Sequence, residues 1–286
     1  MKLINPSVEI REQGAGIDGM LEHIEWAGRH CYKSHDKITS DSAKKFVANI
    51  TKSGHGSVLE HVTIYLSIPA TENILELVLN PCTRIVRCGE EDKNDANDWY
   101  AVTTNYRVIV ENNWDLWLMW ATDPTPHHEK RITAKFICDR GVSHELVRHR
   151  VFSYSQESTR YCNYGREKFG SQITYIKPYW WDVTTDDKEN FKEVLLAAEK
   201  AYLEAIKKWD ERKPDKRFRT GFKGNPLSPQ MARMILPNAL KTELVMTGFE
   251  SDWNFFFELR CSPAAHPDAR YLANKLKQLM KNGKEI

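Results

Sequence analysis

The chain has 286 residues and a formal net charge of +2 at pH 7, from 41 basic and 39 acidic side chains. This near balance argues against a protein whose main partner is a long polyanion, because such proteins carry a wide basic excess. Hydrophobic residues make up 41% and charged residues 28% of the chain, so a sizeable core is available and disorder of the whole is excluded.

Membrane and export signals are weak. The longest run without Asp, Glu, Lys or Arg is residues 61–71, whereas a spanning helix needs about 20 apolar residues. The N-terminus reaches Glu9 before an apolar signal-peptide region could form. The six cysteines show no CxxC pair, which favours reduced thiols. We therefore expect a cytoplasmic protein without a membrane segment.

The first predicted elements mix strands with helices. Apolar and polar side chains alternate within residues 1–15, which is compatible with an opening strand. Residues 19–29 and 41–50 have helical patterns. Residues 61–68 (HVTIYLSI) carry the strongest strand signal in the chain, because β-branched and aromatic side chains dominate and charge is absent.

An unusual segment follows at about residues 69–130, before the next predicted strand at 134–139. It holds an acidic run at residues 90–98, a Trp-rich stretch and a Pro/His tract. We interpret it as an insertion into a single domain that spans residues 1–286.

Helices dominate the rest of the chain. An amphipathic helix is predicted over residues 187–212, a basic loop over 213–223, a helix that begins at Ser228-Pro229, and a terminal helix over 268–281. Helices outnumber strands and do not alternate strictly with them. This order predicts the α+β class, with a central, mostly antiparallel sheet flanked by helices, plus the inserted segment.

The densest chemical signal is the stretch from Arg148 to Arg166, which holds four arginines and one acid. Guanidinium groups present planar forks that suit phosphate oxygens. A solvated basic helix face is the plainer interpretation, but Glu145 and Glu157 supply too little acid to pair these arginines. We therefore expect an anion site here.

A second cluster, GHGSVLEH, occupies residues 54–61. His55, Glu60 and His61 invite a metal interpretation, but their spacing departs from HExxH, and a structural role is the better expectation. We predict no metal site. The chain also lacks GxGxxG, GxxxxGK[ST] and GxSxG, so neither a dinucleotide or phosphate loop nor a serine nucleophile is indicated.

Four elements occur in an order typical of one family. Arg148-His149-Arg150, followed by seven residues and Ser158, matches an RHRx₇S pattern. The other three are the cluster at residues 54–61, ARMILPN at 232–238 and FELR at 257–260. Together they resemble the signature of the flavin-dependent thymidylate synthases, and the resemblance covers most of residues 1–68 and 132–286.

The resemblance implies the reductive methylation of dUMP to dTMP. Methylenetetrahydrofolate would supply the carbon and FAD the hydride, with NADPH as the reductant. Members of this family use no enzymatic cysteine nucleophile, which agrees with the missing motif. The resemblance also implies a homotetramer that holds FAD and dUMP where subunits meet, and no nucleic-acid partner.

The resemblance also implies roles for individual residues. Arg260 would lie beside the uracil as the catalytic residue and favour ionisation at ring nitrogen 3. Ser158 is expected to be a hydrogen-bonding ligand, since no adjacent base would activate it. The residues implied for dUMP are Glu145, Leu146, Val147, Arg148, Gln156, Glu157, Ser158, Thr159, Arg160, Arg233 and Arg260. Those implied for FAD are His55, Ser57, Arg148, His149, Arg150, Val151, Gln156, Asn254 and His266.

The chain departs from the family pattern at four positions. Two of them are among the residues just named, and two lie elsewhere. Glu145 stands where some members have Gln, and Gln156 replaces an acid. Phe249 and Phe255 fall where some members have Asn in contact with the flavin.

Two alternatives from other classes stay open on sequence grounds. The first is a nucleic-acid-binding module that stacks bases on Tyr154, Tyr161 and Tyr164. The second is a metal hydrolase built on the cluster at residues 54–61.

Overall fold

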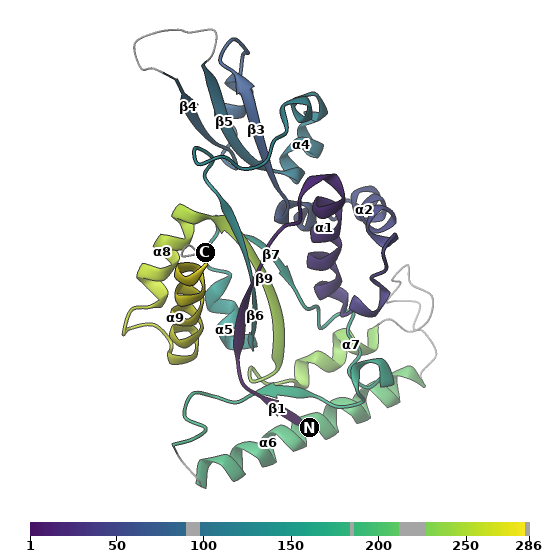
Figure 1. Cartoon of the computed structure of the whole chain (residues 1–286). Helices are drawn as coiled ribbons and strands as arrows, with labels where there is room; N and C mark the ends of the chain where they lie inside the picture. Colours follow the sequence, from purple (N-terminus) through teal and green to yellow (C-terminus); the bar gives the residue numbers. More distant parts are fainter. Residues whose placement is uncertain (90–97, 184–185, 212–226, 284–286) are drawn as a thin grey trace.

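The computed structural model describes residues 1–89, 98–183, 186–211 and 227–283 (Figure 1). Its centre is a four-stranded sheet in which each neighbouring pair of strands is antiparallel. The strands in spatial order are β2 (Ser7–Arg11), β6 (Arg131–Asp139), β9 (Lys241–Phe249) and β7 (Ser153–Gln156). The expected α+β class with a central antiparallel sheet flanked by helices is confirmed.

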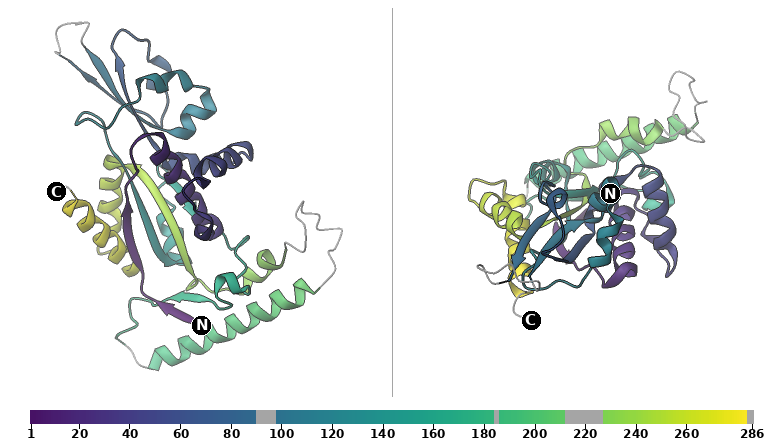
Figure 2. Two further views of the ribbon diagram at one scale, coloured as in Figure 1. Left: turned by 45° about the vertical axis from the view of Figure 1, so that its right-hand side comes forward. Right: turned by 90° about the horizontal axis from the view of Figure 1, so that it is seen from above.

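One face of this sheet packs against three helices (Figures 1 and 2). They are α5 (Arg140–Leu146), α8 (Glu250–Arg260) and α9 (Pro267–Asn282). Phe136 of β6 and Trp253 and Phe256 of α8 are fully buried between these layers. Gly248 in β9 has no room for a larger side chain, because a Cβ there would lie 2.5 Å from the ring of Phe152.

The opposite face is covered by the N-terminal helices (Figure 2). These are α1 (Gly16–Tyr32), α2 (Ser42–Lys52) and the short 3₁₀ segment η2 (Gly56–His61). Ile24, Leu59 and Val245 belong to the core on this side. Strand β9 is buried along almost all of its length because helices cover both faces of the sheet.

The segment predicted as an insertion forms most of a small sheet at one end of the molecule (Figure 1). Its antiparallel strands, in the order β3-β5-β4, are β3 (Thr63–Pro69), β5 (Trp99–Asn105) and β4 (Arg84–Cys88). Around it lie α3 (Leu75–Val78), α4 (Tyr106–Asn112) and η3 (Asp115–Trp120). Trp114, Trp117 and Trp120 pack against the core of β3, so the Trp-rich stretch is local packing. The acidic run lies outside the described residues except for Asp98.

A third layer closes the other end (Figure 1). It contains the parallel pair β1 (Lys2–Ile4) and β8 (Thr174–Ile176), the long α6 (Asp186–Asp210), α7 (Leu227–Ala232) and the 3₁₀ turns η1 (His35–Lys37), η4 (Glu167–Phe169) and η6 (Arg233–Ile235). Tyr175, Leu195 and Tyr202 form its buried centre. The predicted loop at 213–223 lies outside the described residues.

The predicted helices and strands are all present, with bounds that shift by a few residues. The opening strand is two strands, β1 and β2, on either side of Asn5-Pro6, because proline has no N–H for a ladder. Within the described residues, no helix is both long enough and apolar enough to cross a membrane.

Candidate active site

Arg260, the last residue of α8, is held by α5 and the turn after it. Its Nη1 pairs with Glu145 Oε2 at 2.6 Å, and its Nη2 donates to the Glu145 carbonyl at 2.6 Å. Its Nε donates to His149 Nε2 at 2.9 Å. Three fixed partners therefore set the plane of the guanidinium group, which is only 16% exposed.

The local sequence places these partners. Asp139 caps α5 by accepting from the backbone N–H of Val142 at 2.8 Å, and the helix buries Leu146 in the core. Tyr154 of β7 then fixes the turn after α5, because its hydroxyl donates to the carbonyls of Leu146 (3.0 Å) and His149 (2.5 Å). Glu145 and His149 thus point toward Arg260 from a rigid support.

His149 is a neutral acceptor in this arrangement. Its side chain is 7% exposed and lies against the ring of Phe256, with ring centroids 4.9 Å apart. Burial and the positive charge of Arg260 lower its pKa from 6.5 to about 4. The ring can therefore accept the Arg260 N–H at neutral pH.

Other residues implied for the cofactor lie on the helices of this side of the sheet or in the segments beside them. Arg148, Arg150 and Val151 follow α5 and are exposed. Among the described residues, neither arginine has an ion pair. Asn254 is exposed on α8, and His266 caps α9 by accepting from the backbone N–H of Asp268 at 3.3 Å.

A second group forms where β7 ends, beside α1. The backbone N–H of Ser158 donates to the Cys31 carbonyl at 3.0 Å. The Ser158 hydroxyl accepts from the backbone N–H of Arg160 at 3.3 Å, and Arg160 Nε donates to Gln230 Oε1 of α7 at 3.3 Å. Arg233 is exposed on η6, which directly follows α7.

His55 and Ser57 belong to this second group. Both are exposed at the start of η2. His55 Nδ1 lies 3.3 Å from the Tyr32 hydroxyl, and the ring of Tyr32 lies 5.4 Å from that of Tyr161. His55 is thereby linked through two aromatic side chains to the Ser158–Arg160 segment.

Several residues implied for dUMP have buried or occupied side chains, among them Thr159, which is 9% exposed. Leu146 is 0% and Glu157 is 1% exposed. Both Glu157 oxygens are engaged, by Lys241 Nζ at 2.8 Å and the Tyr164 hydroxyl at 2.7 Å. Gln156 Nε2 donates to Ser143 Oγ at 2.9 Å. At Leu146 and Glu157 only the backbone is left to meet a nucleotide.

The two groups lie on opposite faces of the central sheet. Tyr154 contacts α5, whereas its neighbour Ser155 contacts His61 on the α1 side, as alternation along a strand requires. Figure 2 shows α1 and α8 on opposite sides of β9. In the described part of a single chain, no hydrogen bond or ion pair joins Arg260 and its partners to Ser158–Arg160.

Comparison with known proteins identifies the family. The model of the thymidylate synthase complementing protein family matches residues 17–75 and 116–283. The chain belongs to this family. Residues 76–115, which lie within the predicted insertion, are not matched.

Relatives in this family agree with the resemblance read from the motifs. A flavin-dependent thymidylate synthase from Mycolicibacterium vanbaalenii is 27% identical over 266 residues, which are 92% of this chain and 76% of the relative. One from Mycobacterium marinum is 34% identical over 146 residues, 49% of this chain and 54% of the relative.

The comparison with solved structures matches the UMP/dUMP methylase PolB from Streptomyces cacaoi, bound with 5-Br dUMP. It overlaps 99% of this chain and 93% of its own, with 15% sequence identity and a TM-score of 0.43.

The departures from the family pattern have distinct surroundings. Glu145 is the ion-pair partner of Arg260. Phe249 is buried, with the guanidinium groups of Arg84 and Arg131 at 4.4 and 5.5 Å from its ring. Phe255 is 57% exposed on α8. Phe249 of the central sheet thus contacts Arg84 of the small sheet, and two guanidinium groups lie over its ring.

The metal-hydrolase alternative does not fit the geometry. His61 is fully buried, with Nδ1 2.8 Å from Thr247 Oγ1 and Nε2 3.0 Å from Ser155 Oγ. Burial lowers its pKa well below the usual value. Glu60 pairs with Arg107. No set of side chains that could hold a metal ion occurs among the described residues.

The nucleic-acid alternative loses most of its stacking surface. Tyr164 is 5% exposed and bonded to Glu157, and Tyr154 is half-buried in β7. Of the three tyrosines proposed to stack on bases, Tyr161 is the exposed one, at 42%.

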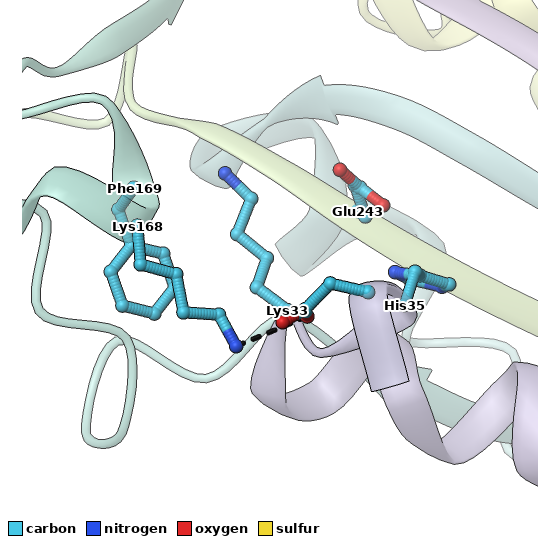
Figure 3. A pocket seen from close by; sticks show the side chains of 6 residues that line it. Lys33, His35, Lys168, Phe169 and Glu243 are labelled. Carbon is cyan, nitrogen blue, oxygen red and sulfur yellow. Dashed lines mark ion pairs between the residues drawn. The ribbon is translucent and has the colours of Figure 1, made fainter. Parts of the chain in front are cut away.

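Sequence reasoning missed a set of buried charges beside the second group. Lys241 and Glu243 lie on β9 and connect Glu157 to His30 of α1. A cavity of about 290 Å³ adjoins them, and Figure 3 shows Lys33 extending from the end of α1 toward the sheet. The cavity is lined by Lys33, His35, Asp36, Lys168, Phe169 and Glu243. The one available signal was two charges in the otherwise uncharged strand KTELVMTGF.

Proposed function

We propose that this chain catalyses the reductive methylation of dUMP to dTMP, with methylenetetrahydrofolate as carbon donor, FAD as the hydride carrier and NADPH as its reductant. Family membership sets the reaction class. The observation that carries the proposal is Arg260, held by Glu145 and His149 at the position where the family motif calls for the catalytic arginine.

Arg260 would act on the uracil ring as a fixed positive charge. A guanidinium group near ring nitrogen 3 favours loss of its proton and stabilises the negative charge that spreads over the ring. Because its plane is set by three contacts, little reorganisation is needed when that charge develops. Neutral His149 serves this role better than a protonated ring, which would repel Arg260.

The residues around this group suit FAD. Arg148 and Arg150 are exposed, and no described residue neutralises them, so their charges are available for a pyrophosphate. Val151, 64% exposed, and Asn254 offer apolar and amide contacts beside them. Bound FAD would supply the hydride, and these side chains would bind and orient it.

The second group suits the dUMP phosphate. Arg160 and Arg233 are exposed guanidinium groups near α7, and Ser158 lies on the turn that carries Arg160. The Ser158 hydroxyl contacts a backbone N–H, and no described acid or histidine lies in contact with it to act as a base. We therefore assign Ser158 to binding, without a covalent step.

We further propose a homotetramer in which each site combines Arg260 of one subunit with Ser158–Arg160 of another. The support is the placement of the two groups on opposite faces of the sheet of one chain. In this proposal residues 1–286 form one catalytic domain, and residues 69–130 are an insertion into it.

A visible spectrum tests the cofactor and Arg260 together. Purified protein loaded with FAD should show flavin absorbance that NADPH bleaches without oxygen. Arg260→Ala should keep this absorbance and lose at least about a hundredfold in turnover, the scale of removing one oxyanion donor. A protein that cannot be loaded with FAD contradicts the proposal.

Mixed subunits test whether sites are shared. Arg260→Ala and Arg160→Ala should each be inactive alone. Co-expressed with different tags and purified through both, they should recover about a quarter of wild-type activity, because that share of randomly assembled sites contains both native groups. A mixed oligomer as inactive as its parents contradicts sharing.

A further inference from the structure

The Ser158–Arg160 segment is attached to the protein interior through Glu157. The Glu157 side chain is 1% exposed. Its Oε2 accepts from Lys241 Nζ at 2.8 Å, and its Oε1 accepts from the Tyr164 hydroxyl at 2.7 Å. Its backbone N–H donates to the Glu243 carbonyl at 2.9 Å. The residue before Ser158 is therefore fixed by both its side chain and its backbone.

The bond from Tyr164 closes a loop. Glu157 and Tyr164 flank residues 158–163, so one buried carboxylate holds both ends of the segment that carries Ser158 and Arg160. Inside the loop, the backbone N–H of Cys162 donates to the Ser158 carbonyl at 2.9 Å. The loop is also held by the Ser158 N–H, which donates to the Cys31 carbonyl, and by Arg160, which donates to Gln230. The Glu157 carboxylate is its charged anchoring point.

Lys241 neutralises this point and links it to β9. Its ammonium group pairs with Glu157 and also with Glu243, whose other oxygen accepts from His30 Nδ1 at 2.9 Å. Burial disfavours the charged form of Lys241, but the two carboxylates outweigh burial and raise its pKa. The ammonium group therefore stays charged, and the carboxylate stays in place.

We propose that Lys241 and Tyr164 are positioning residues for the nucleotide phosphate, acting through Glu157 on the loop that carries Ser158, Thr159 and Arg160. The inference rests on the proposed function and deepens it. Neither residue touches the nucleotide. Together they hold the phosphate-binding loop in its bound shape before the ligand arrives, which reduces the ordering cost of binding.

Tyr164→Phe is the sharpest test, because it removes one hydroxyl and keeps the ring. Tyr175→Phe is a matched control: Tyr175 lies in the same core, is fully buried and donates one hydrogen bond to the Leu195 carbonyl at 3.2 Å, away from the loop. Titration calorimetry on FAD-loaded protein gives the affinities for dUMP and for deoxyuridine, which lacks the phosphate.

Tyr164→Phe should weaken dUMP binding about tenfold and leave deoxyuridine binding within about twofold, while Tyr175→Phe changes neither. In steady state the KM for dUMP should rise with kcat nearly unchanged. Lys241→Met should show the same phosphate-specific loss, and Lys241→Arg should restore part of it.

Two outcomes overturn the inference: unchanged dUMP affinity in folded Tyr164→Phe, or equal losses for dUMP and deoxyuridine. The second would mean a general disturbance of the fold. A wild-type protein that binds dUMP but forms no dTMP contradicts the proposed reaction and leaves the positioning role standing.

Discussion

Replacing His149 by Gln should make the protein more resistant to acid. His149 accepts the Arg260 Nε–H while it is neutral. When it is protonated it loses this capacity and places a second positive charge beside the guanidinium group. Glutamine supplies an acceptor near the same position and cannot be protonated.

The magnitude follows from the pKa of His149, which is about 4 in the folded protein against 6.5 as the ordinary value. Between these pH values the unfolded chain binds more protons, so stability is fully present above about pH 6.5 and falls as the pH drops toward 4. The contribution between pH 7 and pH 5 is about 2 kcal/mol, and about 3 kcal/mol over the whole window.

Urea unfolding at pH 7 and pH 5 measures this difference. The free energy of unfolding of His149→Gln should fall about 2 kcal/mol less than that of wild type between the two pH values. His144→Gln, which replaces an exposed histidine on α5, should behave like wild type. Equal pH dependence in wild type and His149→Gln would refute the neutral, buried state of His149.

Two further predictions concern stability. Lys241→Met leaves Glu157 and Glu243 without their shared cation and should lower the free energy of unfolding by about 3–5 kcal/mol in urea titrations; a loss below about 1 kcal/mol would contradict the buried pair. Gly248→Ala places a Cβ 2.5 Å from the Phe152 ring and should cost about 1–3 kcal/mol. Gly283→Ala, where the nearest atom lies at 3.5 Å, is its control, and equal melting temperatures for the two variants would count against the packing described.

Much of the fold could be predicted because periodicity is a local signal. The strand at 61–68 and the helix at 187–212 follow from side-chain patterns alone. Strand β7 was missed because its sequence, SYSQ, is short and polar. It is a strand because β9 pairs with it and helices cover both faces of the sheet. A local side-chain pattern cannot predict these long-range contacts.

The candidate site also combines features that depend on local sequence with features that depend on long-range packing. The family motifs predicted Arg260 and Ser158 as site residues by spacing, which stays a prediction, and they gave no information on the surroundings of either residue. Glu145 and Arg260 are 115 residues apart in the chain, and Glu157 and Lys241 are 84 apart. These ion pairs depend on how α5, α8 and β9 pack, so sequence spacing could not predict them.

Conversion of dUMP to dTMP through a flavin is the function proposed for this chain. The most direct measurement is chromatographic detection of dTMP from FAD-loaded protein given dUMP, methylenetetrahydrofolate and NADPH without oxygen. We expect one dTMP for each NADPH oxidised, with formation abolished when FAD is withheld or in Arg260→Ala. NADPH oxidation without dTMP, or dTMP formed equally well by Arg260→Ala, would contradict it.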